Sequence, residues 1–130
     1  METTTPAKRH ILLVEDDEFI SDVYTTKLTR EGFEVERADN GEAALKKIHE
    51  HKPQLILLDL MMPVKDGFET LQELKADEDL KDIKVIVLSN LSQPEDKAKV
   101  KALGADDYCV KAEMSFQEMI SKVKAFAAAV

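Results

Sequence analysis

The stretch Gln54-Leu55-Ile56-Leu57-Leu58-Asp59 decides how this chain is expected to fold. Its four consecutive apolar residues form a short run bounded by Pro53 and Pro63, which is typical of a strand buried on both faces of a parallel sheet. The run ends in the carboxylate of Asp59. In open α/β sheets, ligands bind at the edge where the strands end, so the sequence predicts a functional side chain at Asp59.

Short apolar runs alternate with helical patterns along the rest of the chain. Strands are expected at residues 10–14, 33–37, 55–58, 85–88 and 107–110. The five segments between and after them have the period or the caps of helices. This alternation predicts an α/β fold in which helices cover both faces of a doubly wound, five-stranded parallel sheet. Residues 33–37 alternate apolar and polar side chains, which suits an edge strand and favours the flavodoxin-like order 2-1-3-4-5.

The expected helices have recognisable caps and inward faces. Asp17, Asn40 and Asp66 are candidate N-caps, and Ser92–Glu95 and Ser115–Glu118 fit capping boxes. The apolar positions predicted to face inward in the first, fourth and fifth helices are Phe19, Ile20, Val23, Tyr24 and Leu28; Ala98, Ala102 and Leu103; and Phe116, Met119, Ile120, Val123 and Phe126. Residues 1–9 are expected to form a flexible lead-in and residues 10–130 a single domain. Because the chain ends on a helix, we expect no covalently attached output domain.

The composition excludes several classes of function. The 130 residues have a formal net charge of -8, whereas nucleic-acid surfaces are generally basic, so no nucleic-acid partner is expected. No apolar run approaches the roughly 20 residues of a membrane span. A single cysteine, Cys109, fits a reducing compartment and a cytoplasmic location. The three histidines, at positions 10, 49 and 51, have no shared spacing that indicates a metal site.

Polar residues stand at the predicted ends of four strands. Glu15 and Asp16 follow the first strand, Asp59 the third, Ser89 the fourth and Lys111 the fifth. Converging carboxylates repel one another unless a cation lies between them, and a cluster of hard oxygens suits Mg²⁺. A carboxylate beside Mg²⁺ can attack phosphorus, while a lysine and a hydroxyl can bind phosphoryl oxygens. The pattern therefore indicates phosphoryl transfer to a carboxylate.

Over nearly its whole length the sequence resembles the receiver domains of two-component response regulators, most closely the stand-alone chemotaxis type. The matching segments are Leu13-Val14-Glu15-Asp16-Asp17, Leu57-Leu58-Asp59-Leu60-Met61-Met62-Pro63, Asp66-Gly67, Leu88-Ser89, Gly104-Ala105 and Tyr108-Cys109-Val110-Lys111. The resemblance implies that Asp59 accepts a phosphoryl group from a histidine kinase or phosphotransfer protein. It implies a signalling domain that assists its own phosphorylation and dephosphorylation rather than an enzyme.

The same resemblance assigns roles to the other residues of the site. Glu15, Asp16, Asp59 and the backbone carbonyl of Met61 would bind Mg²⁺. Ser89 and Lys111 would bind the phosphoryl group, and Tyr108 would change rotamer on activation together with Ser89. The fourth helix, fifth strand and fifth helix would form the surface that contacts an unidentified output protein, in a monomer or a phosphorylation-dependent dimer.

Three features of the sequence depart from the usual receiver pattern. Ala112 follows Lys111 where a cis proline is usual, and a cis bond before any other residue costs roughly 2.5–4 kcal/mol. We therefore expect a trans Lys111–Ala112 peptide and a rerouted loop. Asn90 occupies a position where small residues are common, which predicts tighter access for the phosphoryl group. Met61 and Leu91 are apolar neighbours of the site, and they predict slow self-dephosphorylation.

Other interpretations remain open at this stage. Asp17 could be only a helix cap, and Tyr108 only a half-buried strand residue. An aspartyl-phosphate phosphohydrolase of the haloacid dehalogenase type would need a second aspartate two positions after the nucleophile, where this chain has Met61. A non-phosphorylated interaction module with the same fold would not need the carboxylate set.

Overall fold

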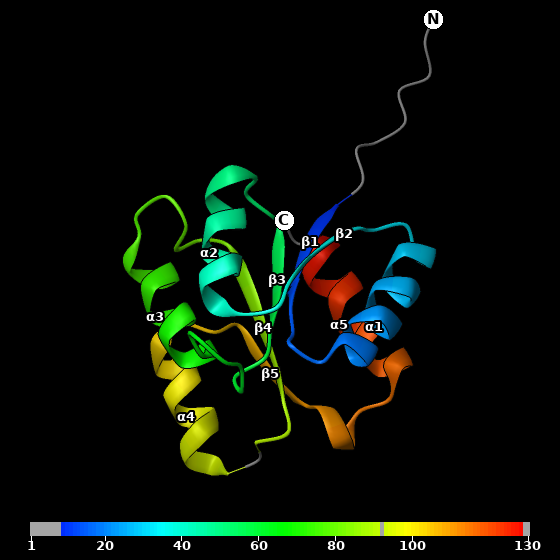
Figure 1. The fold of residues 1–130 in the computed structure, drawn as a ribbon. Helices are drawn as coiled ribbons and strands as arrows, with labels where there is room; N and C mark the ends of the chain where they lie inside the picture. The colour runs from blue at the N-terminus through cyan, green and yellow to red at the C-terminus, as the bar shows by residue number, and fades with distance from the viewer. Residues whose placement is uncertain (1–8, 92, 129–130) are drawn as a thin grey trace, which may run out of the picture.

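The computed structural model of the protein describes residues 9–91 and 93–128. Five parallel strands form one sheet in the order β2-β1-β3-β4-β5, which confirms the predicted topology (Figure 1). The strands are β1 His10–Val14, β2 Glu34–Ala38, β3 Leu55–Leu58, β4 Lys84–Ser89 and β5 Asp107–Val110. The helices are α1 Glu18–Arg30, α2 Gly41–Glu50, α3 Gly67–Ala76, α4 Pro94–Leu103 and α5 Phe116–Ala128, with a short 3₁₀ helix, η1, at Lys111–Glu113.

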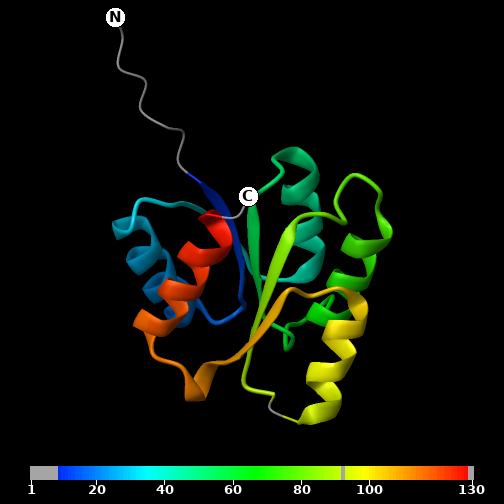
Figure 2. The same ribbon diagram turned by 180° about the vertical axis from the view of Figure 1, so that it is seen from behind.

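Helices cover both faces of the sheet. Figures 1 and 2 show α1 and α5 on one side of it and α2, α3 and α4 on the other. Alternate residues of β1 point to opposite faces: Ile11 and Leu13 pack with α1 and α5, whereas Leu12 and Val14 pack with the other three helices. Each fully buried aliphatic side chain contributes roughly 1.5–3 kcal/mol to folding. The two layers therefore hold the central strands, and the residues that follow them, in fixed positions.

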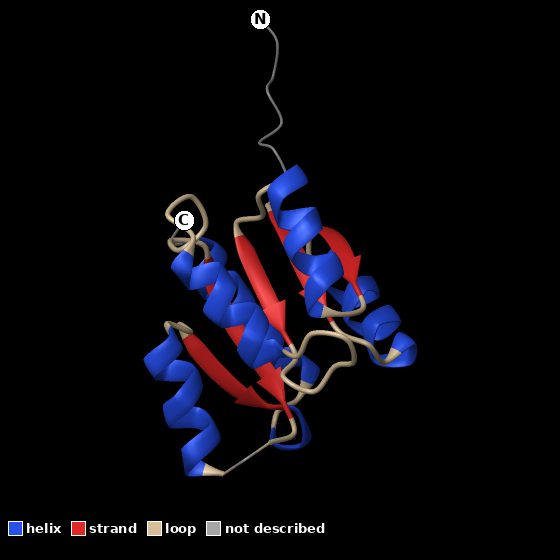
Figure 3. Cartoon of the chain, turned by 60° about the vertical axis from the view of Figure 1, so that its left-hand side comes forward, coloured by secondary structure: helices blue, strands red, loops and turns tan. Residues whose placement is uncertain are grey.

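The strands run in the same direction, so their carboxyl ends all lie at the same end of the sheet (Figure 3). The described helices include none that is both long enough and apolar enough to cross a bilayer.

The predicted helix caps are formed where the structure describes them. The side chains of Asp17, Asn40 and Asp66 accept hydrogen bonds from the backbone N–H three residues later, at 3.1, 2.8 and 2.9 Å. Ser115 and Glu118 form a reciprocal capping box at 3.1 and 3.2 Å. The box predicted at Ser92 lies outside the described residues, and Gln93 precedes α4 without a side-chain cap bond.

The predicted inward face of α1 was wrong at its first residue. Phe19 is 76% exposed, and the buried residues of α1 are Ser21, Tyr24 and Leu28. With about 100° between successive residues, Phe19 projects almost opposite to that buried stripe. Phe116, predicted to be buried in α5, is 39% exposed because it lies in the first turn, where it packs edge-to-face on Tyr24.

The predicted inward face of α4 was wrong at Ala98 and Ala102. Ala98 and Ala102 are exposed, Leu103 is half-buried, and Val100 is the buried residue of this helix. Two residues correspond to about 200° of rotation, so Ala98 and Ala102 both project away from the side on which Val100 meets the core. A mostly polar helix with small apolar residues provides a weak signal for its inward face.

Candidate functional site

The three predicted carboxylates meet at the carboxyl ends of β1 and β3. These strands are adjacent, with Val14 opposite Leu58, and the backbone N–H of Asp59 donates to the Val14 carbonyl at 3.0 Å. One carboxylate oxygen from each of Glu15, Asp16 and Asp59 lies within 4.8 Å of the other two. Glu15 and Asp59 are buried, and Asp16 is exposed. The carboxylate cluster is therefore accessible to solvent through Asp16.

Gly67 fixes the position of Asp59 from the other side. Its N–H donates to the Leu60 carbonyl at 3.0 Å, so α3 begins against the backbone of the site. A Cβ at this position would lie 2.3 Å from the carbonyl oxygen of Asp59 and 2.6 Å from Leu60 Cα. Any larger residue would displace that backbone. The sequence indicated Gly67 only as part of the Asp66-Gly67 segment that resembles the receiver family, because close backbone approach leaves no other local signal.

Lys111 joins the cluster from the end of β5. Its ammonium forms an ion pair with Glu15 and lies 3.4 Å from Asp59 Oδ2. Burial alone would lower the pKa of Lys111, but the hydrogen bond to Glu15 and the charges of Asp59 and Glu15 outweigh burial and raise it. The lysine is therefore held in its charged form, facing the oxygens it was predicted to accompany.

The charge balance of the site favours a further cation. Although Asp16 is exposed, partial desolvation by the surrounding protein raises its pKa, and the neighbouring charge of Glu15 raises it further. A divalent cation would relieve this repulsion, and three oxygen ligands with solvent access suit Mg²⁺. The residues present therefore fit the predicted metal. Met61 lies beside them, with its N–H 3.3 Å from Asp59 Oδ1, while Asp17 is engaged as the cap of α1.

Ser89 and Tyr108 meet through the loop that follows β4. Ser89 is fully buried, and its hydroxyl oxygen accepts from the Leu91 N–H at 3.2 Å. The Tyr108 hydroxyl donates to the Leu91 carbonyl at 2.5 Å. Burial raises the pKa of Tyr108, which keeps that donor protonated. One residue, Leu91, thus contacts both predicted switch side chains.

The Lys111–Ala112 peptide bond is trans, as predicted for a chain without proline at position 112. The described residues contain no cis peptide bond, and Lys111 begins the short helix η1. The Ala112 N–H, which a proline would lack, donates to Asn90 Oδ1 at 3.1 Å. The sequence indicates a departure at both positions but not the bond between them, because 22 residues separate the partners.

Comparison with known proteins agrees with this geometry. The family model of the response regulator receiver domain matches residues 11–124. The chain is 39% identical over 115 residues to the DNA-binding dual master transcriptional regulator RpaA of Synechocystis, covering 88% of this chain and 47% of that protein. It is 38% identical over 115 residues to the CpxR homolog of Haemophilus influenzae, covering 88% and 48%. The chain thus spans about half the length of these curated relatives.

Solved structures show the same fold. The receiver domain of the Francisella response regulator 1452 superimposes with a TM-score of 0.86 at 30% identity, over 94% of this chain and 98% of that one. The chemotaxis response regulator CheY4 of Vibrio cholerae superimposes with a TM-score of 0.86 at 28% identity, over 92% of this chain and 99% of that one.

Proposed function

This chain belongs to the response regulator receiver domain family, whose members are phosphorylation-activated signalling switches, and we propose that Asp59 is its phosphoacceptor. The observation that supports this assignment most strongly is the contact of Lys111 with Asp59 Oδ2 at 3.4 Å, next to the carboxylates of Glu15 and Asp16. Of the three carboxylates, only that of Asp59 lies next to both the Lys111 ammonium and the backbone N–H of Met61.

The proposed reaction is a transfer from a phosphohistidine to Asp59. A carboxylate oxygen of Asp59 bonds to phosphorus as the P–N bond of the donor breaks, and the leaving imidazole nitrogen keeps the electron pair and takes up a proton. Lys111 and the hydroxyl of Ser89 bind the phosphoryl oxygens as charge moves onto them. Glu15, Asp16, Asp59 and the Met61 carbonyl would hold Mg²⁺, which supplies charge neutralisation at the phosphoryl group when bound.

In the proposed switch, Leu91 connects Ser89 with Tyr108. A hydrogen bond from Ser89 to the phosphoryl group pulls on the β4–α4 loop, and Tyr108 follows because its hydroxyl is bound to the Leu91 carbonyl. The phosphoryl group shifts a pre-existing equilibrium between two forms. A shift from 1:99 to 99:1 requires it to favour the active form by roughly 5.5 kcal/mol, which several charge-assisted contacts can supply.

The proposed partners follow from the same assignment. A histidine kinase or phosphotransfer protein donates the phosphoryl group in the cytoplasm. An output protein binds the surface of α4, β5 and α5, where a cavity of about 300 Å³ is lined by Tyr108, Lys97 and Lys101 among others. We propose no nucleic-acid contact for this domain, because the chain has a net charge of -8.

The assignment is tested by phosphorylation with acetyl phosphate and Mg²⁺, read by intact-mass spectrometry. We expect one phosphoryl group on the parent chain and none on Asp59→Asn. Asp66→Asn is the matched control: the residue is in the same loop, and asparagine can still cap α3. Equal labelling of Asp59→Asn and the parent would overturn the assignment.

The same protein also tests the phosphohydrolase alternative. Met61 has no group that can act as the acid or base in repeated hydrolysis, so we expect no multiple-turnover cleavage of phosphomonoesters. Sustained turnover that is lost in Asp59→Asn would show an enzyme in place of a signalling domain.

A further inference from the structure

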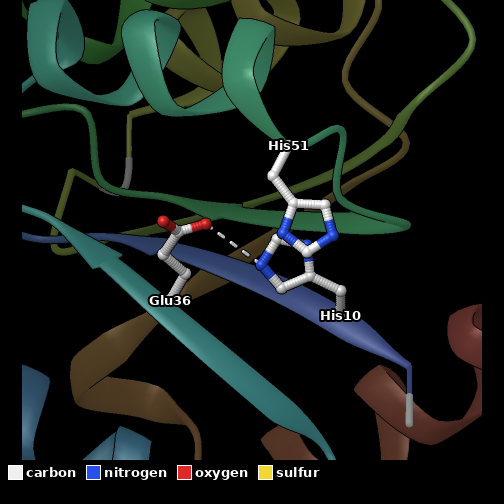
Figure 4. Close-up of side chains that lie close together, drawn as sticks. All are labelled: His10, Glu36 and His51. Atoms are coloured by element: carbon white, nitrogen blue, oxygen red, sulfur yellow. Dashed lines mark ion pairs between the residues drawn. The ribbon is translucent and has the colours of Figure 1, made fainter. Parts of the chain in front are cut away.

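A second cluster of potential metal ligands lies at the opposite edge of the sheet from Asp59. It consists of His10 at the start of β1, Glu36 in β2 and His51 directly after α2 (Figure 4). One ligand atom from each of the three residues lies within 4.8 Å of the other two. His10 precedes Glu15 by five residues, so at about 3.3 Å per residue the cluster is roughly 16 Å from the carboxylate site.

The cluster contains buried polar atoms without hydrogen bonds. His10 is 6% exposed, and neither His10 Nδ1 nor Glu36 Oε1 has a hydrogen-bond partner among the described residues. His10 Nε2 and Glu36 Oε1 nevertheless form an ion pair at 3.2 Å, so the buried atom of the cluster that lacks a partner is His10 Nδ1. The ammonium of Lys47 is 3.9 Å from the other oxygen of Glu36. A cation between His10 Nε2 and Glu36 Oε1 would replace this contact with two metal–ligand bonds and would neutralise the carboxylate of Glu36.

The distance of 3.2 Å between His10 Nε2 and Glu36 Oε1 is close to the distance between two ligand atoms of one metal ion. Zinc binds imidazole nitrogen and carboxylate oxygen at about 2.0–2.2 Å in tetrahedral geometry, which places neighbouring ligand atoms about 3.3–3.5 Å apart. His10 is held in place by its backbone, which exchanges two hydrogen bonds of 2.9 Å with Gln54. The first ligand is therefore fixed before any ion binds.

His51 provides an adjustable third ligand. Its ring stacks on that of His10, with centroids 4.0 Å apart and planes 12° from parallel. The lone pairs of parallel rings do not converge, so the His51 ring must turn to share an ion with His10. It is exposed and follows the last residue of α2, so this rotation disturbs no packed side chain of the core.

We propose that His10, Glu36 and His51 form a binding site for one divalent transition-metal ion of the zinc class, with solvent in the remaining position. Two imidazoles and a carboxylate suit Zn²⁺ and disfavour Mg²⁺, which prefers oxygen ligands. The ion would link β1, β2 and the end of α2. It would stabilise the folded domain by mass action, independently of the phosphorylation chemistry.

The test is Zn²⁺ titration by calorimetry of the full chain without a polyhistidine tag, in an Asp16→Asn background that weakens the carboxylate site. We expect one Zn²⁺ per chain and a rise in the melting temperature. His51→Ala and Glu36→Gln should each weaken binding at least about tenfold, since each removes one of three protein ligands. His49→Ala is the matched control, because this exposed histidine is two residues away and faces Asp77.

Imidazole ¹⁵N chemical shifts give a second measurement that does not depend on stability. We expect the resonances of His10 and His51 to shift with added Zn²⁺ and those of His49 to stay unchanged. Zn²⁺ binding that is absent, or equally strong in His51→Ala and in the parent background, would overturn the proposal. An effect of His49→Ala as large as that of His51→Ala would also overturn it.

Discussion

Asn90 Oδ1 accepts a hydrogen bond from the Ala112 N–H at 3.1 Å, and this bond ties the loop after β4 to the segment after β5. Asn90 directly follows Ser89, and Ala112 directly follows Lys111, so the two phosphoryl-binding residues are joined through their neighbours. Proline at position 112 would remove the donor. Two of the departures from the usual receiver pattern, at Asn90 and Ala112, thus form one interaction.

The coupling of this pair can be measured. Asn90→Ala should slow phosphorylation of Asp59 by acetyl phosphate roughly twofold to tenfold, since a hydrogen bond of this kind contributes about 0.5–1.5 kcal/mol. In an Ala112→Pro background the donor is already absent, so the same substitution should have little further effect. Equal effects of Asn90→Ala in both backgrounds would show that Asn90 acts without Ala112.

Removal of the Lys111 charge should affect metal binding and phosphorylation in opposite directions. The ammonium lies 3.4 Å from Asp59 Oδ2 and forms an ion pair with Glu15, so it competes with a metal ion for the same oxygens. A unit charge at about 4 Å contributes about 1 kcal/mol even in a water-like dielectric. Lys111→Met should therefore bind Mg²⁺ about fivefold more tightly, as measured by calorimetry, and accept phosphate more slowly.

Lys122→Met is the control for the Lys111 variant. It removes the same charge from a lysine that pairs with Asp107, 2.5 Å away, outside the carboxylate cluster. Its Mg²⁺ affinity should match that of the parent. Weaker Mg²⁺ binding by Lys111→Met would mean that the lysine organises the carboxylates and does not compete for them.

The sequence predicts the candidate site because its residues directly follow buried strands. Once the runs before Glu15, Asp59 and Lys111 are assigned to strands of one parallel sheet, the end of the sheet at which these side chains meet is determined. The strand order was predictable for a similar reason, since only the segment that became β2 alternates polar and apolar side chains as an edge strand does.

Contacts between distant segments could not be predicted in this way. The His10, Glu36 and His51 side chains come from three elements and share no spacing, so the sequence offered no metal motif. The predicted buried faces were wrong at Phe19 of α1 and at Ala98 and Ala102 of α4, because a helical period alone does not separate the buried side of a helix from the exposed one. Val100 is fully buried in a helix that is otherwise mostly charged or small, and only the packing of α4 on the sheet reveals its role.

The thiol of Cys109 should react only at high pH. Burial, with a smaller contribution from Asp107, raises the pKa of Cys109 to about 11. At pH 8 about one folded molecule in a thousand then carries the thiolate, so iodoacetamide should label the folded chain at least about a hundredfold more slowly than the unfolded chain. Rapid labelling at pH 8 under native conditions would contradict burial of this thiol.

The same pKa shift has a consequence for stability. An unfolded thiol loses its proton at about pH 8.5, whereas the folded Cys109 keeps it to about pH 11. Between these values the unfolded state binds fewer protons, so the free energy of unfolding should fall as the pH rises. Cys109→Ala should remove this part of the pH dependence, as measured by urea unfolding at several pH values.

Val64 should be a site of backbone strain in the loop that follows Asp59. It has a φ of 68°, in the left-handed region, and its side chain is 75% exposed. A β-branched residue is unfavourable there by roughly 1–2 kcal/mol. Val64→Asn should relieve part of this strain and raise the melting temperature by about 2–4 °C. Val64→Ile retains the β-branch and should give no gain.

The lifetime of the aspartyl phosphate should depend on Met61. Its N–H is anchored 3.3 Å from Asp59 Oδ1, and its side chain is 61% exposed beside the carboxylate, where it can obstruct an attacking water. Leu91, the other predicted obstruction, is half-buried and packs against the core, so it is a less direct candidate.

Met61→Asn should therefore shorten the phosphate half-life about threefold to tenfold, which corresponds to a barrier lower by about 0.7–1.4 kcal/mol. Met61→Leu keeps an apolar side chain of similar size and should retain the parent half-life. The measurement is the loss of the phosphorylated mass after removal of acetyl phosphate, in excess Mg²⁺. An unchanged half-life in Met61→Asn would show that this side chain does not limit the access of water to Asp59.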